Sequence, residues 1–190
     1  MFNLPIALTW LRIVLIPVFV GVYYLPPTLL SPSAKNWTAM IVFALAAITD
    51  WLDGYLARRL GETSAFGAFL DPVADKLMVA AALIVLVWLD RAEVYLAIII
   101  IGREIAISAL REWMARLGKG RSVAVALVGK VKTAAQMTAI IALLLWDPVI
   151  PGISTALVGE IALWVAAILT LWSMLHYLRL AAPHFSDTQN

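Results

Sequence analysis

The sequence predicts an all-α membrane protein of six transmembrane helices plus a short N-terminal interfacial helix. Hydrophobic residues make up 63% of the 190 residues and charged residues only 14%. This composition is too apolar for a soluble domain, and the chain is long enough for several spans of about 20 residues each. We see no sequence repeat and no appended soluble segment, so we expect a single membrane domain over residues 1–190.

The first three expected spans cover about residues 7–25, 35–59 and 65–89. Residues 1–10 mix polar and apolar positions, which indicates a short interfacial piece that runs into the first span. Pro17 is expected to kink that span, and Pro72 to kink or loosen the third. The N-terminus lacks a basic region and a small-residue cleavage site, so the first apolar run is interpreted as a retained span and not as a signal peptide.

The last three expected spans cover about residues 92–117, 124–146 and 155–180. Short polar or proline-containing segments separate them, as in the turn Asp90-Arg91 and the loop at residues 118–122. The fourth span is unusual because Arg103-Glu104 and Arg111-Glu112 lie inside it. Charged groups within a span are expensive unless they have partners or a function.

The distribution of basic residues predicts the orientation of the chain. Six spans place both termini on one side, and basic residues gather on the cytoplasmic side of a membrane. The N-terminal side carries eight basic residues, namely Arg58, Arg59, Arg116, Lys119, Arg121, Lys130, Lys132 and Arg179. The other side carries two, Lys35 and Arg91. We therefore expect both termini to be cytoplasmic.

Four carboxylates lie within 26 residues at the end of the second span and the start of the third. On a helix, Asp50 and Asp53 share a face because they are three residues apart, and Asp71 and Asp75 do so because they are four apart. If the two helices are adjacent and antiparallel, the four side chains converge. Clustered oxygen donors favour Mg²⁺, Mn²⁺ or Ca²⁺ over zinc or copper.

Small residues and a guanidinium accompany these carboxylates. Gly54, Ala57 and Gly67 leave room for the close approach of a ligand or another backbone. Arg58, one turn beyond Gly54, offers a planar fork for a phosphate group. Carboxylates, a divalent metal and a guanidinium together indicate phosphoryl or nucleotidyl chemistry. The chain has no cysteine, and its two histidines lie near the C-terminus, so thiol catalysis and a histidine-ligated metal are not expected.

These residues form the pattern D-x-x-D-G-x-x-A-R, eight residues, G-x-x-x-D-x-x-x-D, which resembles the signature of the CDP-alcohol phosphotransferases. The resemblance implies a CDP-diacylglycerol donor, one or two Mg²⁺ (or Mn²⁺) ions and a homodimer. The metal ligands that it implies are Asp50, Asp53, Asp71 and Asp75, of which Asp75 would also be the catalytic general base. The CDP-diacylglycerol-binding residues that it implies are Thr9, Gly54, Ala57, Arg58, Ser64 and Gly67. Family members often carry Asn where this chain has Ile6.

The acceptor alcohol is expected to be glycerol 3-phosphate, because four basic residues of the fourth and fifth spans suit a phosphorylated alcohol. These residues are Arg103, Arg111, Lys130 and Lys132. The products would be phosphatidylglycerophosphate and CMP, as a step of phospholipid biosynthesis in the bacterial cytoplasmic (inner) membrane, with the active site facing the cytoplasm. Related enzymes that take inositol phosphate, serine or phosphatidylglycerol have the same signature. The expected partners are the two substrates, membrane lipids and a second copy of the chain, and no nucleic acid.

Other interpretations stay open from the sequence alone. The aspartates could form structural salt bridges with nearby basic residues, and Arg103 and Arg111 could pair locally with the glutamates that follow them. Arg12, near the start of the first span, could extend to the lipid headgroups or reach the carboxylates. A small cation transporter would also carry charges inside its spans. Its charges should be spread through the membrane, whereas the acidic residues of the central spans collect near one face.

Overall fold

The computed structural model describes residues 4–60, 65–116 and 127–182, with no strand among them. The described helices are α1 (Leu4–Tyr24), α2 (Pro32–Leu60), α3 (Ala65–Trp88), α4 (Val94–Arg116), α5 (Leu127–Leu145) and α6 (Thr155–Ala181). Each helix falls on one of the expected spans, so the all-α fold class is confirmed.

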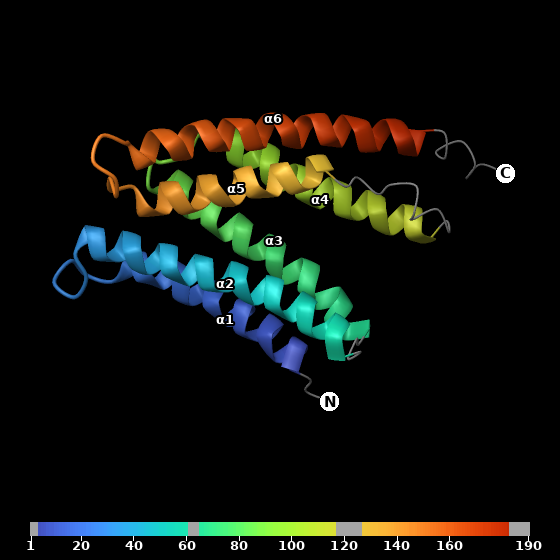
Figure 1. The fold of residues 1–190 in the computed structure, drawn as a ribbon, viewed down its shortest axis with the longest axis horizontal. Helices are drawn as coiled ribbons and strands as arrows, with labels where there is room; N and C mark the ends of the chain where they lie inside the picture. Colours follow the sequence, from blue (N-terminus) through green and yellow to red (C-terminus); the bar gives the residue numbers. More distant parts are fainter. Residues whose placement is uncertain (1–3, 61–64, 117–126, 183–190) are drawn as a thin grey trace.

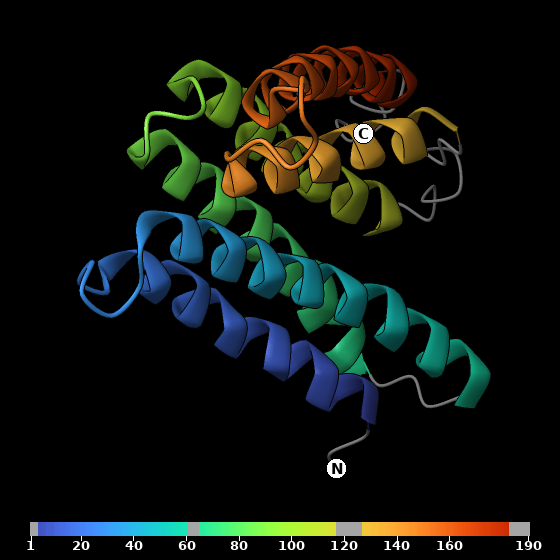
Figure 2. The same cartoon turned by 60° about the vertical axis from the view of Figure 1, so that its left-hand side comes forward.

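The helices form two neighbouring groups. Helix α1 lies beside α2, and α5 lies beside α6, with α4 packed on α6 (Figures 1 and 2). Helix α3 runs between the groups and contacts α1, α2, α4 and α5. The start of α1 and the ends of α2, α4 and α6 lie at one end of the molecule, on the right in Figure 1. This end is called the proximal end below, and the opposite end is called the distal end.

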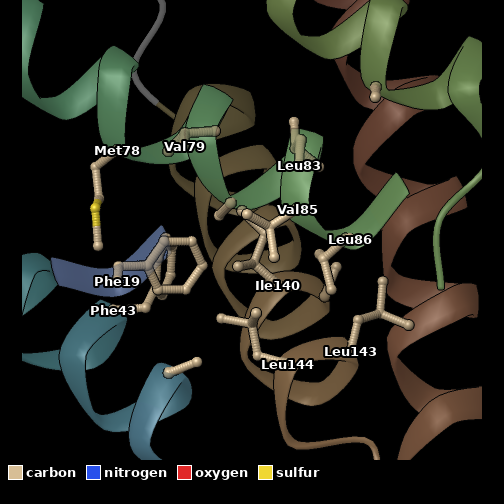
Figure 3. Packing of buried hydrophobic residues seen from close by; sticks show 14 of the residues in the cluster. Phe19, Phe43, Met78, Val79, Leu83, Val85, Leu86, Ile140, Leu143 and Leu144 are labelled. Atoms are coloured by element: carbon tan, nitrogen blue, oxygen red, sulfur yellow. The ribbon is translucent and has the colours of Figure 1, made fainter. Parts of the chain in front are cut away.

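A single large core joins the two groups. Phe19 of α1 and Phe43 of α2 meet Leu83 of α3 and Ile140 of α5, all with at most 2% of their surface exposed (Figure 3). Gly159 allows α6 to approach α5 closely, because an added Cβ would lie 2.7 Å from Cγ of Leu143. Tight contacts of this kind stabilise helix pairs by van der Waals packing even where lipid replaces water.

Two helices are long and apolar enough to cross a membrane within the described part of the chain. They correspond to Ile6–Tyr24 and Thr155–Ala181, and Val131–Leu145 is a shorter apolar helix. The outer face of α6 exposes Ile161, Ile168 and Leu175, which follow each other every seven residues and are all more than half exposed. Such a continuous apolar surface fits contact with lipid. These features support a membrane protein, while six spans and their orientation stay predictions.

The N-terminal segment corrects one expectation. The short interfacial helix is not a separate element in the described residues, because α1 runs without a break from Leu4 to Tyr24. Pro5 does not interrupt it, since proline is tolerated in the first turn of a helix, where its missing N–H group needs no partner. Helices α1 and α3 also continue through Pro17 and Pro72.

A polar network joins three helix ends at the distal end. Arg91, in the turn after α3, donates from Nη1 to the carbonyl oxygens of Leu143 (3.1 Å) and Leu144 (3.0 Å) at the end of α5. Its Nη2 donates to Oδ1 of Asn36 at 2.8 Å, and Nδ2 of Asn36 donates to Oδ2 of Asp147 at 3.3 Å. Burial lowers the pKa of Arg91 from its ordinary value, while Tyr23 and Asp147 oppose that shift.

Candidate active site

Three helices meet at Arg12 near the proximal end. Nη1 of Arg12 on α1 lies 2.8 Å from Oδ1 of Asp50 on α2 and 3.0 Å from Oδ1 of Asp71 on α3. The Arg12 side chain is only 1% exposed, whereas the two aspartates are about 40% exposed. Arg12 therefore reaches the carboxylates from the buried side and does not extend to the headgroups. The two aspartates converge, as the motif spacing predicts, and leave an open side for a ligand.

Asp75 extends this carboxylate site along α3. It lies four residues after Asp71, so the two side chains share a helix face. Asp75 and Arg12 both line a small cavity of about 10 Å³, together with Met78 of α3 and Met137 of α5. This volume is close to the minimum for one water molecule. The expected base thus lies at the inner wall of the site, close to the buried guanidinium.

The remaining residues of the expected donor site are only partly described. Thr9 is 3% exposed and lies three residues before Arg12 on α1, and Gly67 lies in the first turn of α3. Asp53, Gly54, Ala57 and Arg58 lie on the last turns of α2, but their side-chain positions are outside the described part of the structure, as is all of Ser64. Their expected roles stay predictions.

The donor atoms of the carboxylate site fit a hard divalent cation. Two oxygens from different helices face one nitrogen of Arg12, and all the acidic groups here are carboxylates, the ligands that Mg²⁺ and Mn²⁺ prefer. Among the described side chains, no group of three or more acidic or histidine residues lies close enough together to hold a metal ion. Asp50, Asp71 and Asp75 are the described members of the expected ligand set, and of these Asp50 and Asp71 meet at Arg12, while the side chain of Asp53 lies outside the described residues.

A second site, called the basic pocket here, lies between α4, α5 and α6. Its cavity has a volume of about 720 Å³. The lining residues are Arg103, Glu104, Arg111, Gly129, Lys132, Thr133, Ala134, Met137, Ser173 and Tyr177. Three of the four residues expected to bind the acceptor phosphate are brought together here, and the side chain of the fourth, Lys130, is not described.

Contacts between helices hold the basic side chains of this pocket in place. Oε1 of Glu104 accepts from Nη1 of Arg103 at 3.1 Å and from Nζ of Lys132. Nη2 of Arg103 also donates to Oγ of Ser173 at 2.9 Å, and Nη2 of Arg111 donates to Oη of Tyr177 at 2.7 Å. Two cations thus share the carboxylate of Glu104, and Arg111 adds a third positive charge to the lining of the cavity.

The alternative of two local Arg-Glu pairs on α4 is half right. Arg103 does contact Glu104, but Arg111 contacts Tyr177 of α6. Glu112 pairs instead with Arg116 at 2.5 Å, and both side chains are at least 66% exposed. Arg111 is therefore part of the basic pocket, while Glu112 belongs to the surface.

Met137 connects the two sites. Its side chain lines the basic pocket and also the small cavity next to Arg12 and Asp75. The basic pocket therefore adjoins the inner wall of the carboxylate site.

Sequence reasoning did not identify Ser173 and Tyr177, and it left Arg12 undecided. The spacing of Ser173 and Tyr177, four residues apart on α6, gives a signal for a shared helix face. Nothing in the sequence showed that this face meets the arginines of α4. Arg12 had a stronger signal, because a charged residue in an apolar span is expected to have a partner or a function.

Comparisons with known proteins show the family of this chain. The sequence profile of the CDP-alcohol phosphatidyltransferase family matches residues 2–172. A CDP-diacylglycerol–glycerol-3-phosphate 3-phosphatidyltransferase of Shigella flexneri serotype 5b (strain 8401) is 52% identical over 192 residues, which cover 98% of each chain. The protein of the same name from Escherichia coli (strain K12) is 51% identical over the same length and coverage.

Proposed function

Because the chain belongs to the CDP-alcohol phosphatidyltransferase family, we propose that it transfers the phosphatidyl group of CDP-diacylglycerol to glycerol 3-phosphate. The products are phosphatidylglycerophosphate and CMP. This proposal depends on the sequence identity of 51–52% to two CDP-diacylglycerol–glycerol-3-phosphate 3-phosphatidyltransferases, which extends over 98% of each chain. Neighbouring acidic and basic sites in the structure support it independently, since the reaction needs a site for the pyrophosphate of the donor and another for the phosphate of the acceptor.

The transfer exchanges one phosphorus–oxygen bond for another. A hydroxyl oxygen of the acceptor bonds to the phosphorus that carries the diacylglycerol, and the bond from that phosphorus to the bridging oxygen breaks, so that CMP leaves with the bridging oxygen. The hydroxyl proton passes to Asp75, which acts as the general base. Asp75 lines the small cavity, which shares Met137 with the basic pocket, and this proximity to a bound acceptor supports the role.

The carboxylate site would hold one or two divalent cations, Mg²⁺ or Mn²⁺, through Asp50, Asp53, Asp71 and Asp75. Such an ion neutralises the pyrophosphate and stabilises the charge of the leaving CMP. Arg12 fixes the spacing of Asp50 and Asp71 by contacting both at once from within the protein. The cytidine phosphate would be bound by Thr9, Gly54, Ala57, Arg58, Ser64 and Gly67.

The basic pocket would bind the phosphate of the acceptor. Arg103, Arg111 and Lys132, with Glu104 among them, leave an excess of two positive charges if each group has its usual charge. This excess matches a phosphate monoester dianion and not a neutral amino acid such as serine. Guanidinium groups also favour phosphate because their paired N–H groups match its oxygens. The pocket therefore favours glycerol 3-phosphate over serine.

The proximal end is proposed to face the cytoplasm of the bacterial inner membrane, with six spans and both termini on that side. Support comes from the excess of basic residues in the segments at this end and from the apolar outer faces of α1 and α6. The enzyme is proposed to act as a homodimer, as the family resemblance implies. A cation transporter is disfavoured because the acidic residues of α2 and α3 all lie in the proximal halves of these two helices.

An acceptor panel tests the proposed function. The purified protein in detergent micelles receives radiolabelled CDP-diacylglycerol, Mg²⁺ and one of four acceptors: glycerol 3-phosphate, inositol phosphate, serine or phosphatidylglycerol. We expect label to enter lipid product, with release of CMP, only with glycerol 3-phosphate. Label transfer to another acceptor would assign a different member of the family. Metal flux in vesicles without any CMP release would favour a transporter instead.

A further inference from the structure

We propose that Tyr177 is a positioning residue of the basic pocket, which holds Arg103 and Arg111 in the orientation that receives the phosphate of the acceptor. The nature of the ligand rests on the proposed function, while the role of the tyrosine rests on contacts within the protein. The sequence motif contains no residue of α6, so this assigns that helix a part in acceptor binding.

The ring and the hydroxyl of Tyr177 each contact a guanidinium group. Cζ of Arg111 lies 5.1 Å from the ring centroid, and Cζ of Arg103 lies 5.7 Å from it. The hydroxyl oxygen accepts a hydrogen bond from Nη2 of Arg111 at 2.7 Å. One side chain of α6 is thereby in contact with two cations that are eight residues apart on α4.

These contacts oppose a repulsion that the pocket creates. Two like charges near each other in a partly buried site repel, and the negative face of an aromatic ring attracts both of them. Each arginine side chain also loses rotamer freedom when it binds a ligand, and fixing it beforehand reduces that loss. Tyr177 therefore holds the arginine side chains of the empty pocket near the orientation in which they bind phosphate.

The position of the Tyr177 ring is itself fixed by packing. The side chain is 2% exposed and belongs to a small buried cluster with Ile107 and Met114 of α4 and Ala181 of α6. Its neighbour one turn earlier, Ser173, accepts a hydrogen bond from Arg103. The face of α6 that packs on α4 thus contacts both arginines, and the cluster anchors it.

The class of ligand follows from the charges and hydrogen-bond donors that the residues around Tyr177 present to the cavity. Arg103 and Lys132 share the carboxylate of Glu104. Arg111 has no acidic partner among the described salt bridges, and its described hydrogen bond goes to the neutral hydroxyl group of Tyr177. A guanidinium group with its other N–H groups facing a cavity favours a phosphate monoester. Arg111, set by Tyr177, is therefore the primary contact of that phosphate.

Two substitutions separate the hydroxyl from the ring. In Tyr177→Phe the ring keeps its contacts with both arginines, and only the hydrogen bond from Arg111 is lost. The KM for glycerol 3-phosphate should therefore rise about tenfold. In Tyr177→Leu both contacts are lost, and that KM should rise about 30-fold or more. The KM for CDP-diacylglycerol and the kcat should stay within about twofold of the wild-type values, as expected for a loss of uniform acceptor binding.

Tyr24→Phe is the matched control. Tyr24 lies at the distal end of α1 with 74% of its surface exposed, stacked on Trp88, so the same chemical change should leave every kinetic constant unaltered. Thermal unfolding of each variant reports whether it is folded. If Tyr177→Leu fails to fold, Tyr177→Phe alone decides, because it keeps the packed ring.

Inorganic phosphate gives a second readout that does not depend on the acceptor. It should inhibit the wild-type enzyme by competing with the acceptor, and its inhibition constant should rise in Tyr177→Phe by the same factor as the acceptor KM. An unchanged acceptor KM and inhibition constant in Tyr177→Phe, or equal effects on both substrates, would overturn the role of Tyr177. Failure of the proposed function appears differently, as a wild-type enzyme that does not use glycerol 3-phosphate.

Discussion

The polar groups at the two ends of the molecule differ in how their charges are balanced. At the distal end, Arg91 donates to two helix-terminal carbonyl groups and to Asn36, which in turn donates to Asp147. One cation and one anion are joined through neutral groups, and every described contact ends within the protein. Such a network satisfies the hydrogen bonds of its members within the protein.

The proximal half has an excess of charge in two places. In the carboxylate site, Arg12 is the described cation beside three aspartates, Asp50, Asp71 and Asp75. In the basic pocket, Arg103 and Lys132 share the carboxylate of Glu104, and Arg111 is a third cation in the lining. Uncompensated charges of this kind are costly within a protein unless ligands bind them. The comparison teaches that charge balance separates the structural network of this chain from its candidate active site.

The largest expected effect is that of Asp75→Asn. Loss of the proposed base should lower kcat by about 1,000-fold, since positioned general bases contribute about 10²–10⁴-fold. CMP release from CDP-diacylglycerol measures the rate. Asp147→Asn makes the same chemical change in the distal network and should keep turnover within about twofold. If both variants turn over normally, Asp75 is not the base.

The next effect in size is that of Arg111→Ala. A charged hydrogen-bonding group contributes about 1.5–3 kcal/mol, so the KM for glycerol 3-phosphate should rise about 10- to 100-fold. The KM for CDP-diacylglycerol should change little. Arg116→Ala is the control, because this exposed arginine on the same helix pairs with Glu112 at the surface. Equal rises for both substrates would place Arg111 outside the acceptor pocket.

A smaller effect is expected from Asp71→Asn, which removes one of the two converging carboxylates. The Mg²⁺ concentration for half-maximal activity should rise about tenfold, since changes near a metal typically weaken its binding by about 10–100-fold. Titration with Mg²⁺ in a chelated buffer measures the shift. Asp90→Asn serves as the control, because Asp90 lies at the distal end with a φ of 58°, which asparagine also tolerates. A normal titration in Asp71→Asn would argue against ligation by Asp71.

Much of the fold could be predicted because long apolar runs and the segments between them are local signals. Helix α6 ends within one residue of the predicted span. The start of α2 was placed too late, at Lys35, although the signal was present: Oγ of Ser31 accepts from the backbone N–H of Ala34 at 3.2 Å, and Pro32 occupies the first helical position.

The residues of the candidate site could be predicted where the sequence marks them by charge and spacing, whereas their contact partners could not. Asp50 and Asp71 follow from the motif, and their meeting requires only that α2 and α3 be adjacent. The partners of Arg103 and Arg111 depend instead on the angle and register at which α6 packs on α4. Tyr177 therefore had no signal beyond its spacing from Ser173. Arg12 stayed undecided for the same reason, because its role depends on which face of α1 meets α2 and α3.

The smallest expected effect on activity is that of Arg91→Met, which tests the structural side of the comparison. It should leave kcat/KM within about twofold and destabilise the protein by about 1–3 kcal/mol, because the carbonyl groups of Leu143 and Leu144 lose their donor. Thermal unfolding in detergent measures the loss. Arg116→Met, which removes only an exposed ion pair, should cost at most about 1 kcal/mol. If Arg91→Met instead abolished turnover in a protein that stays folded, charge balance would not separate structural from functional networks in this chain.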